Sequence, residues 1–172
     1  VMDFTTAQKA TFRSDIQAQS QVGQPLQVAV AAGNFDAVAA FYNATATPAF
    51  WVWRSTVSRA DVYNSTSDLP SNWSWATYKA QAVTEQNAWT QMFMGDIADF
   101  SQDNLRAGVV SIFSGSAPAN AQQAHILAVG RRTVTRLEKL LAAGTGSTAS
   151  PAKLGSEGTV TAQQCSDVFS GF

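Results

Sequence analysis

The chain contains one histidine, His125, and one cysteine, Cys165, so a nucleophile paired with a histidine base would have to use them. His125 falls inside a long predicted helix, four residues before Val129, and no nucleophile motif accompanies it. We expect His125 to be a partly exposed helical residue. We expect Cys165 to pack as a small hydrophobic side chain, and the sequence predicts no catalytic residue.

Three carboxylates, Asp96, Asp99 and Asp103, are close enough in sequence to suggest a calcium or magnesium site. Their spacing matches no EF-hand loop, and Phe100 lies among them. Asp103 fits better as a first-turn residue of a helix that Ser101 would cap, where its charge meets the positive end of the helix dipole. A phosphate loop is not supported either, because the glycine-rich run near 144–146 lacks the Lys-Ser/Thr pair. No metal ion and no cofactor is predicted.

Basic residues gather on a predicted long helix, residues 119–143. We expect its apolar face to consist of Leu127, Val134, Leu137 and Leu141. Its basic residues are Arg131, Arg132, Arg136 and Lys139. The arginines allow three interpretations: a solvated helix face, a contact with a carboxylate or phosphate, or a salt bridge between subunits. Such a helix can pack one side and present the other to a partner.

Tryptophans are the second candidate for contact with a partner. The chain has five, and two pairs, Trp51 with Trp53 and Trp73 with Trp75, are each separated by a single residue. A helix or a strand does not easily bury both members of such a pair against one core. One member of each pair is therefore a candidate for a subunit interface, where Trp and Arg are enriched.

Composition limits the function classes. The 172 residues suit one domain with a sizeable core, but only 13% are charged and the formal net charge is −1. A chain without a positive field does not hold nucleic acid as its main role, although DNA could pass nearby. No apolar stretch is long enough to span a membrane and no signal sequence is evident, so we expect a protein made in the cytoplasm.

Helical periodicity dominates the whole chain, and we find no sustained two-residue alternation. The predicted fold class is therefore all-α, a bundle of about five to seven helices. Residues 1–143 would form this helical domain, and residues 144–172, rich in Gly, Ser and Thr, would form a flexible C-terminal arm that becomes ordered on binding a partner. Phe169 and Phe172 would anchor that arm. The expected helices, in chain order, begin after Thr5, at 26, at 35 after Asn34, at 55, at 73, at 102, at 119 and after Thr161.

Five blocks of the sequence, in order, resemble a family of small proteins encoded among the virion genes of tailed bacteriophages. The resemblance covers about residues 34–165. The blocks are TPAFWVWR at 47–54, NWSWATY at 72–78, AWTQMFMG at 88–95, NLRAGVVSIFSG at 104–115 and GRRTVTRLEKLLAAGTGSTASPAKLGSEG at 130–158.

The resemblance implies a non-enzymatic structural protein, most like the head-tail connector or neck adaptor, located in the neck or tail region of the virion. It implies a homo-oligomeric ring that binds the portal protein and tail proteins, with DNA only passing through the lumen and no contact with a membrane. A tail nozzle or tube component and a capsid decoration protein are alternatives. A virion-associated hydrolase that uses His125 or the Asp96, Asp99 and Asp103 set is an alternative of another class, and so is a small DNA-binding regulator that uses the arginine helix. The expected partner interface is formed by Trp51, Trp53, Arg131, Arg132, Arg136, Phe169 and Phe172.

Overall fold

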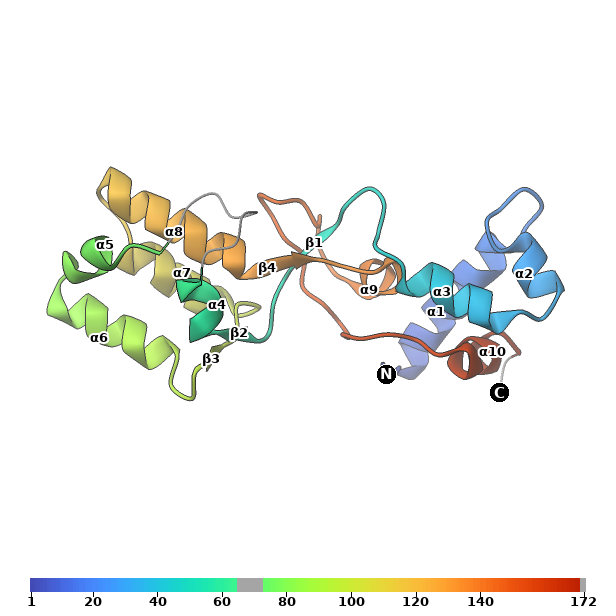
Figure 1. Cartoon of the computed structure of the whole chain (residues 1–172). Coiled ribbons are helices and arrows are strands. Elements are labelled where there is room, and N and C mark those ends of the chain that lie inside the picture. The colour runs from blue at the N-terminus through green and yellow to red at the C-terminus, as the bar shows by residue number, and fades with distance from the viewer. Residues whose placement is uncertain (65–72, 171–172) are drawn as a thin grey trace. The chain divides into compact units, whose positions relative to one another are not determined.

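The computed structural model describes residues 1–64 and 73–170 (Figure 1). The described residues form ten helices, six of them of seven residues or more, and 53% of the described residues are helical. The predicted helical character is confirmed. The prediction of a purely all-α fold is wrong, because four short strands pair as two small two-stranded sheets, β1 with β4 and β2 with β3.

The chain forms two compact units. Unit 1 is built from both ends of the chain, Val1–Val52 and Thr133–Phe172, and unit 2 is the segment between them, Trp53–Arg132. The chain leaves unit 1 along β1 (Trp51–Trp53) and returns along β4 (Arg131–Thr133). The predicted boundary at residue 143 is not a boundary of either unit.

Unit 1 is held together by helices from both ends of the sequence. Its helices are α1 (Thr6–Gln19), α2 (Gln27–Ala31), α3 (Phe35–Asn43), α9 (Arg136–Leu141) and α10 (Ala162–Ser170). In Figure 1, α10 lies beside α1 and α3, and these helices share one core. Three of them begin with a reciprocal cap of Thr and Gln or Glu, at Thr5, Thr135 and Thr161.

Residues 144–170 are part of unit 1 in the single chain. Ala152 donates its backbone N–H to the Trp51 carbonyl at 2.9 Å, and the Thr159 carbonyl accepts the N–H of Met2 at 2.9 Å. The side chain of Asn43 binds both the N–H and the carbonyl of Val160, at 2.9 and 2.8 Å. That this arm becomes ordered by a partner stays a prediction.

Unit 2 surrounds a core rich in aromatic side chains. Its elements are β2 (Val57–Ser58), α4 (Arg59–Tyr63), α5 (Trp75–Lys79), α6 (Val83–Met92), β3 (Ile97–Ala98), α7 (Asp103–Ile112) and α8 (Ala117–Val129). β2 pairs antiparallel with β3, with Val57 opposite Ala98 and Ser58 opposite Ile97. Trp89, Phe93, Phe100 and Phe113 are each at most 1% exposed in this core.

The predicted helix over residues 119–143 is wrong. α8 ends at Val129, β4 follows, and Thr135 then caps the separate helix α9. The three residues from Thr133 to Thr135 are all β-branched and favour extended backbone. Thr135 also accepts the N–H of Glu138 at 3.2 Å, which starts a new helix at that point.

The predicted helix over residues 73–94 is interrupted as well. α5 ends at Lys79 and α6 begins at Val83. The Glu85 carboxylate accepts the backbone N–H of Ala82 at 3.1 Å, which fixes the start of α6. Local capping therefore overrides the helical spacing of the apolar residues.

Candidate functional site

A pocket of about 500 Å³ opens in unit 1 between α1, α3 and α9. We name it the α1–α3–α9 pocket. Each helix contributes two or more side chains, and the segment after α3 closes one side. Its lining residues are Asp15, Gln19, Phe41, Tyr42, Ala46, Thr47, Arg136, Lys139 and Leu140. Arg136 is the predicted interface residue that lies in this pocket.

Helix capping places the pocket residues. Asn34 caps α3 by accepting the N–H of Ala37 at 3.1 Å, and the next turns bury Val38 and Tyr42. Phe41 is then half-buried at the pocket wall. On α9, the inward positions are taken by Leu137 and Glu138, which are 0% and 3% exposed. The flanking positions, Arg136 and Lys139, therefore face the pocket.

A hydrogen bond joins two walls of the pocket. The Tyr42 hydroxyl donates to Asp15 Oδ2 at 2.6 Å. Burial of the ring, and then the Asp15 carboxylate, raise the pKa of Tyr42 well above its usual value. The Tyr42 hydroxyl therefore remains a donor, and part of the acceptor capacity of Asp15 is already used.

The two cations of the pocket lie over aromatic rings. The Arg136 guanidinium is 4.1 Å from the centroid of the Phe41 ring, and its Nη1 donates to the Phe41 carbonyl at 3.2 Å. The Lys139 ammonium is 5.8 Å from the centroid of the Phe50 ring. Stacking and one hydrogen bond hold the plane of the guanidinium, and the Phe41 carbonyl uses one of its five N–H donors.

The predicted interface residues come from both units, and four of them, Trp51, Trp53, Arg131 and Arg132, lie on the paired strands β1 and β4. Trp51, Arg136 and Phe169 belong to unit 1, whereas Trp53, Arg131 and Arg132 belong to unit 2. All six are half-buried, and Phe172 lies outside the described residues.

Two of the predicted interface residues, Phe169 and Trp53, use part of their ring surface for contacts within the chain. The Phe169 ring lies 5.9 Å from that of Phe35 and packs against the unit 1 core. The Trp53 ring packs against the unit 2 core, with the Arg106 guanidinium 4.5 Å from its centroid. The interface role of these residues stays a prediction.

His125 is fully buried, so the expectation of a partly exposed histidine is wrong. Its Nε2 lies 2.8 Å from the carbonyl oxygen of Val62, which can only accept, so this nitrogen carries the proton. Nδ1 of His125 and Nε2 of Gln122, one turn earlier, are buried without a hydrogen-bond partner among the described residues. A reactant that used His125 would have to enter the core of unit 2.

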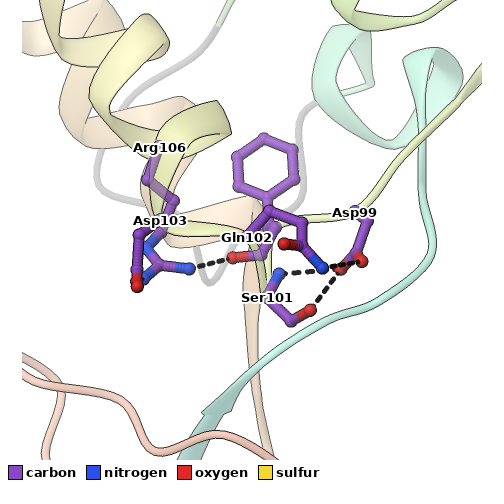
Figure 2. A network of polar contacts seen from close by, with 6 residues as sticks. Asp99, Ser101, Gln102, Asp103 and Arg106 are labelled. Atoms are coloured by element: carbon purple, nitrogen blue, oxygen red, sulfur yellow. Dashed lines mark hydrogen bonds and ion pairs between the residues drawn. The ribbon is translucent and has the colours of Figure 1, made fainter.

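The carboxylates of Asp99 and Asp103 have different hydrogen-bond partners (Figure 2). Asp99 accepts from the backbone and hydroxyl of Ser101 at 2.9 and 2.6 Å and from Gln102 Nε2 at 3.0 Å. Burial alone would raise the pKa of Asp99, but these hydrogen bonds outweigh it and lower the pKa. Asp103, at the start of α7, pairs with Arg106, which also donates to the Phe100 carbonyl.

Within residues 1–64 and 73–170, no three His, Cys, Asp or Glu side chains are grouped so that they could hold a metal ion. In the same residues, no helix combines the length and the apolar character that a membrane span requires.

A turn after α6 exposes two apolar side chains. Met94 and Ile97 are 79% and 54% exposed. We name residues 93–97 the Met94–Ile97 turn. Its backbone includes Asp96 at a φ of 64°, a conformation that non-glycine residues rarely adopt. The sequence offered Gly95 as a helix terminator there but no signal of an exposed apolar pair.

Arg59 holds the Met94–Ile97 turn. Its Nη2 donates to the Phe93 carbonyl at 3.1 Å, and its backbone N–H donates to the Asp96 carbonyl at 3.1 Å. Arg59 Nε also lies 3.8 Å from the Asp96 carboxylate. Two exposed apolar side chains on a held backbone are a candidate surface for contact with another protein.

Comparison with known proteins adds no relative. No family model matches the chain, and no curated protein and no solved structure matches it.

Sequence reasoning missed most of the α1–α3–α9 pocket. Arg136 was a candidate, but Asp15, Phe41 and Tyr42 come from α1 and α3, far from it in the sequence. The spacing of Thr135 and Glu138 is the available signal, because it marks a helix start that places Arg136 and Lys139 on one side of a short helix.

Cys165, on α10, is 0% exposed, and burial raises its pKa to about 12. Because the thiolate is the reactive form, we expect the native chain to react with an aromatic disulfide reagent much more slowly than the unfolded chain at about pH 8. A reaction equally fast with and without urea would contradict this.

The folded-state pKa of Cys165 lies above the ordinary value of 9.0, so this group supports the folded state fully below that value. Its contribution is lost as the pH rises through the interval from about 9 to about 12. The free energy of unfolding should therefore fall more over this interval in the wild type than in Cys165→Ala, measured by urea titration.

Proposed function

We propose that this protein is a structural component of a tailed-bacteriophage virion, a neck adaptor whose copies form a ring between the portal protein and the tail. The five blocks that resemble the virion family support this proposal. The block at 88–95 supplies Trp89, Phe93 and the exposed Met94, and the block at 130–158 supplies β4 and α9. The residues that carry the resemblance thus build a core and candidate contact surfaces.

The exposure of the Met94–Ile97 turn is the observation that supports a role in assembly. Its apolar side chains project from a backbone that Arg59 holds, so little backbone entropy is lost when a partner covers them. In the proposed ring, the partner that covers this turn is a neighbouring copy of the chain. A net charge of −1 permits such self-association, because the copies repel one another only weakly.

The test is native mass spectrometry of the purified chain, alone and mixed with the portal protein of the same phage. We expect a closed homo-oligomer, or a ring that forms on the portal. A chain that stays monomeric under both conditions would contradict the adaptor proposal. Photo-crosslinking from residues 145–150 and from Phe169 then distinguishes virion positions: crosslinks to the portal support the neck, and crosslinks to the capsid support a decoration protein instead.

Replacing Met94 and Ile97 together by Ser is expected to weaken assembly by about tenfold or more, because two exposed apolar side chains lose their burial between copies. The matched control is Val22→Ser with Val28→Ser, which removes two side chains that are 88% and 79% exposed in unit 1. The fraction of oligomer against concentration measures the effect. Equal losses in the two double variants would show that the turn has no special role.

A further inference from the structure

The α1–α3–α9 pocket combines charge and apolar surface in a way that selects a ligand. Its cations are Arg136 and Lys139, and the carboxylate among its lining residues is Asp15. The lining therefore carries one net positive charge. A group with a single negative charge neutralises it, and each further negative charge on a ligand adds to the repulsion from the Asp15 carboxylate.

Arg136 is already arranged for such a group. Its guanidinium is fixed by the Phe41 ring and by the Phe41 carbonyl, so little freedom remains to be lost on binding. The planar fork of N–H donors matches the two oxygens of a carboxylate. Lys139, three residues later on α9, supplies a second cation.

Apolar surface adjoins these cations. Phe41 and Leu140 line the pocket beside them, and both side chains are half-buried. The pocket of about 500 Å³ therefore has room for a carboxylate together with a neighbouring apolar side chain. That combination occurs in a peptide segment in which Glu or Asp follows an aromatic or aliphatic residue.

We propose that the α1–α3–α9 pocket binds an acidic-apolar peptide segment of a partner protein, with Arg136 binding its carboxylate. Lys139 adds a longer-range attraction, and Phe41 with Leu140 packs against the neighbouring apolar side chain. The identity of the partner as another virion protein rests on the proposed function. The binding of an acidic-apolar peptide by this pocket does not depend on the proposed function.

The test is an NMR titration of the full chain with the capped peptide acetyl-Gly-Phe-Glu-Gly-amide, and with the same peptide carrying Gln in place of Glu. We expect the Glu peptide to shift the amide signals of residues 41–47 and 136–140 in a saturable way. The Gln peptide should bind about tenfold more weakly or worse, because it lacks the charged hydrogen bonds. Equal affinity for the two peptides would overturn the proposal.

Variants assign the binding to named residues. Arg136→Gln with Lys139→Gln should abolish the shifts, and Lys139→Gln alone should weaken binding while leaving the Arg136 contacts with Phe41 in place. Arg13→Gln is the matched control, because Arg13 is an exposed cation on α1 that does not line the pocket. If Arg13→Gln weakens binding as much as the pocket variants, the peptide is attracted by the charge of the protein as a whole, and the proposal fails.

Titration with inorganic phosphate tests the other anionic ligand. Tighter binding of phosphate than of the Glu peptide would replace the peptide proposal with a phosphate site. The outcomes also separate this proposal from the adaptor role. A ring without discrimination between the Glu and Gln peptides refutes the pocket proposal alone, and discrimination without any assembly refutes the adaptor alone.

Discussion

Replacing Trp89 by Ala is expected to lower the free energy of unfolding of unit 2 by about 3–5 kcal/mol. Trp89 is 1% exposed, and its ring lies 5.3 Å from Trp73, 4.9 Å from Phe93 and 5.4 Å from Phe113. Its Nε1 also donates to the Tyr63 hydroxyl at 3.4 Å. The variant leaves a large cavity at the point where these rings meet, and the surrounding core can fill it only in part.

Hydrogen exchange measured along the chain checks both the size and the location of this effect. Exchange should accelerate in α6, α7 and α8, whose buried side chains share the Trp89 core. The core of unit 1 is a separate cluster, so α1, α3 and α10 should keep their protection.

Trp75→Ala is the control for the Trp89 variant, because it removes the same side chain from a position that is 51% exposed. We expect it to lower the free energy of unfolding by about 1 kcal/mol, the value of its ring contacts with Tyr63 and Trp73. If the two variants are equally destabilised, the aromatic core does not depend on Trp89 in the way described.

Features decided by neighbouring residues could be predicted from the sequence. The reciprocal caps at Thr5 and Thr161 and the Asn34 cap are present as expected. Helical spacing also accounts for Val38 and Tyr42, which lie one turn apart on α3 and are both buried. Caps and stripes are visible because all their partners lie within one or two turns of the same helix.

Features decided by distant contacts could not be predicted. The apolar spacing continues through Gly130, so the sequence alone favours one helix where the structure has α8, β4 and α9. Gly130 ends α8 against Phe100: a Cβ at this glycine would lie 2.3 Å from the Phe100 ring. The Gly, Ser and Thr content from residue 144 onward favours a flexible arm, and the contacts of this segment with Trp51, Asn43 and Met2 are too remote in sequence to be predicted.

The same distinction applies to the candidate site. Arg136 was identified by residue type, since arginine serves carboxylates and interfaces alike. Asp15 and Phe41 acquire a role only when α1 and α3 pack against α9. The Met94–Ile97 turn depends on Arg59, more than thirty residues earlier, and no periodicity indicates that contact.

Glu138→Ala is expected to destabilise unit 1 by about 3 kcal/mol, because a buried carboxylate with at least two backbone partners is removed. Glu138 is 3% exposed and accepts from Thr135 N at 3.1 Å through Oε2 and from Gly158 N at 3.2 Å through Oε1. The first bond starts α9, and the second fixes the chain that leads to α10. Without the carboxylate, both buried N–H groups lose an acceptor.

Glu138→Gln should have an intermediate effect, since its one amide oxygen can serve only one of the two N–H groups. Glu85→Ala is the matched control in unit 2: Glu85 occupies the same position of its helix and accepts the N–H of Ala82, which is exposed. We expect that variant to lose about 1 kcal/mol. For all three variants, urea titration measures the free energy of unfolding, and hydrogen exchange locates the change along the chain.

Because α9 also carries Arg136 and Lys139, Glu138 links the stability of unit 1 to peptide binding. In Glu138→Ala, faster exchange in α9 and α10 should accompany weaker binding of the Glu peptide, whereas Glu85→Ala should leave both unchanged. Full peptide affinity in a chain whose α9 has lost its protection would show that the two cations act without the helix that positions them.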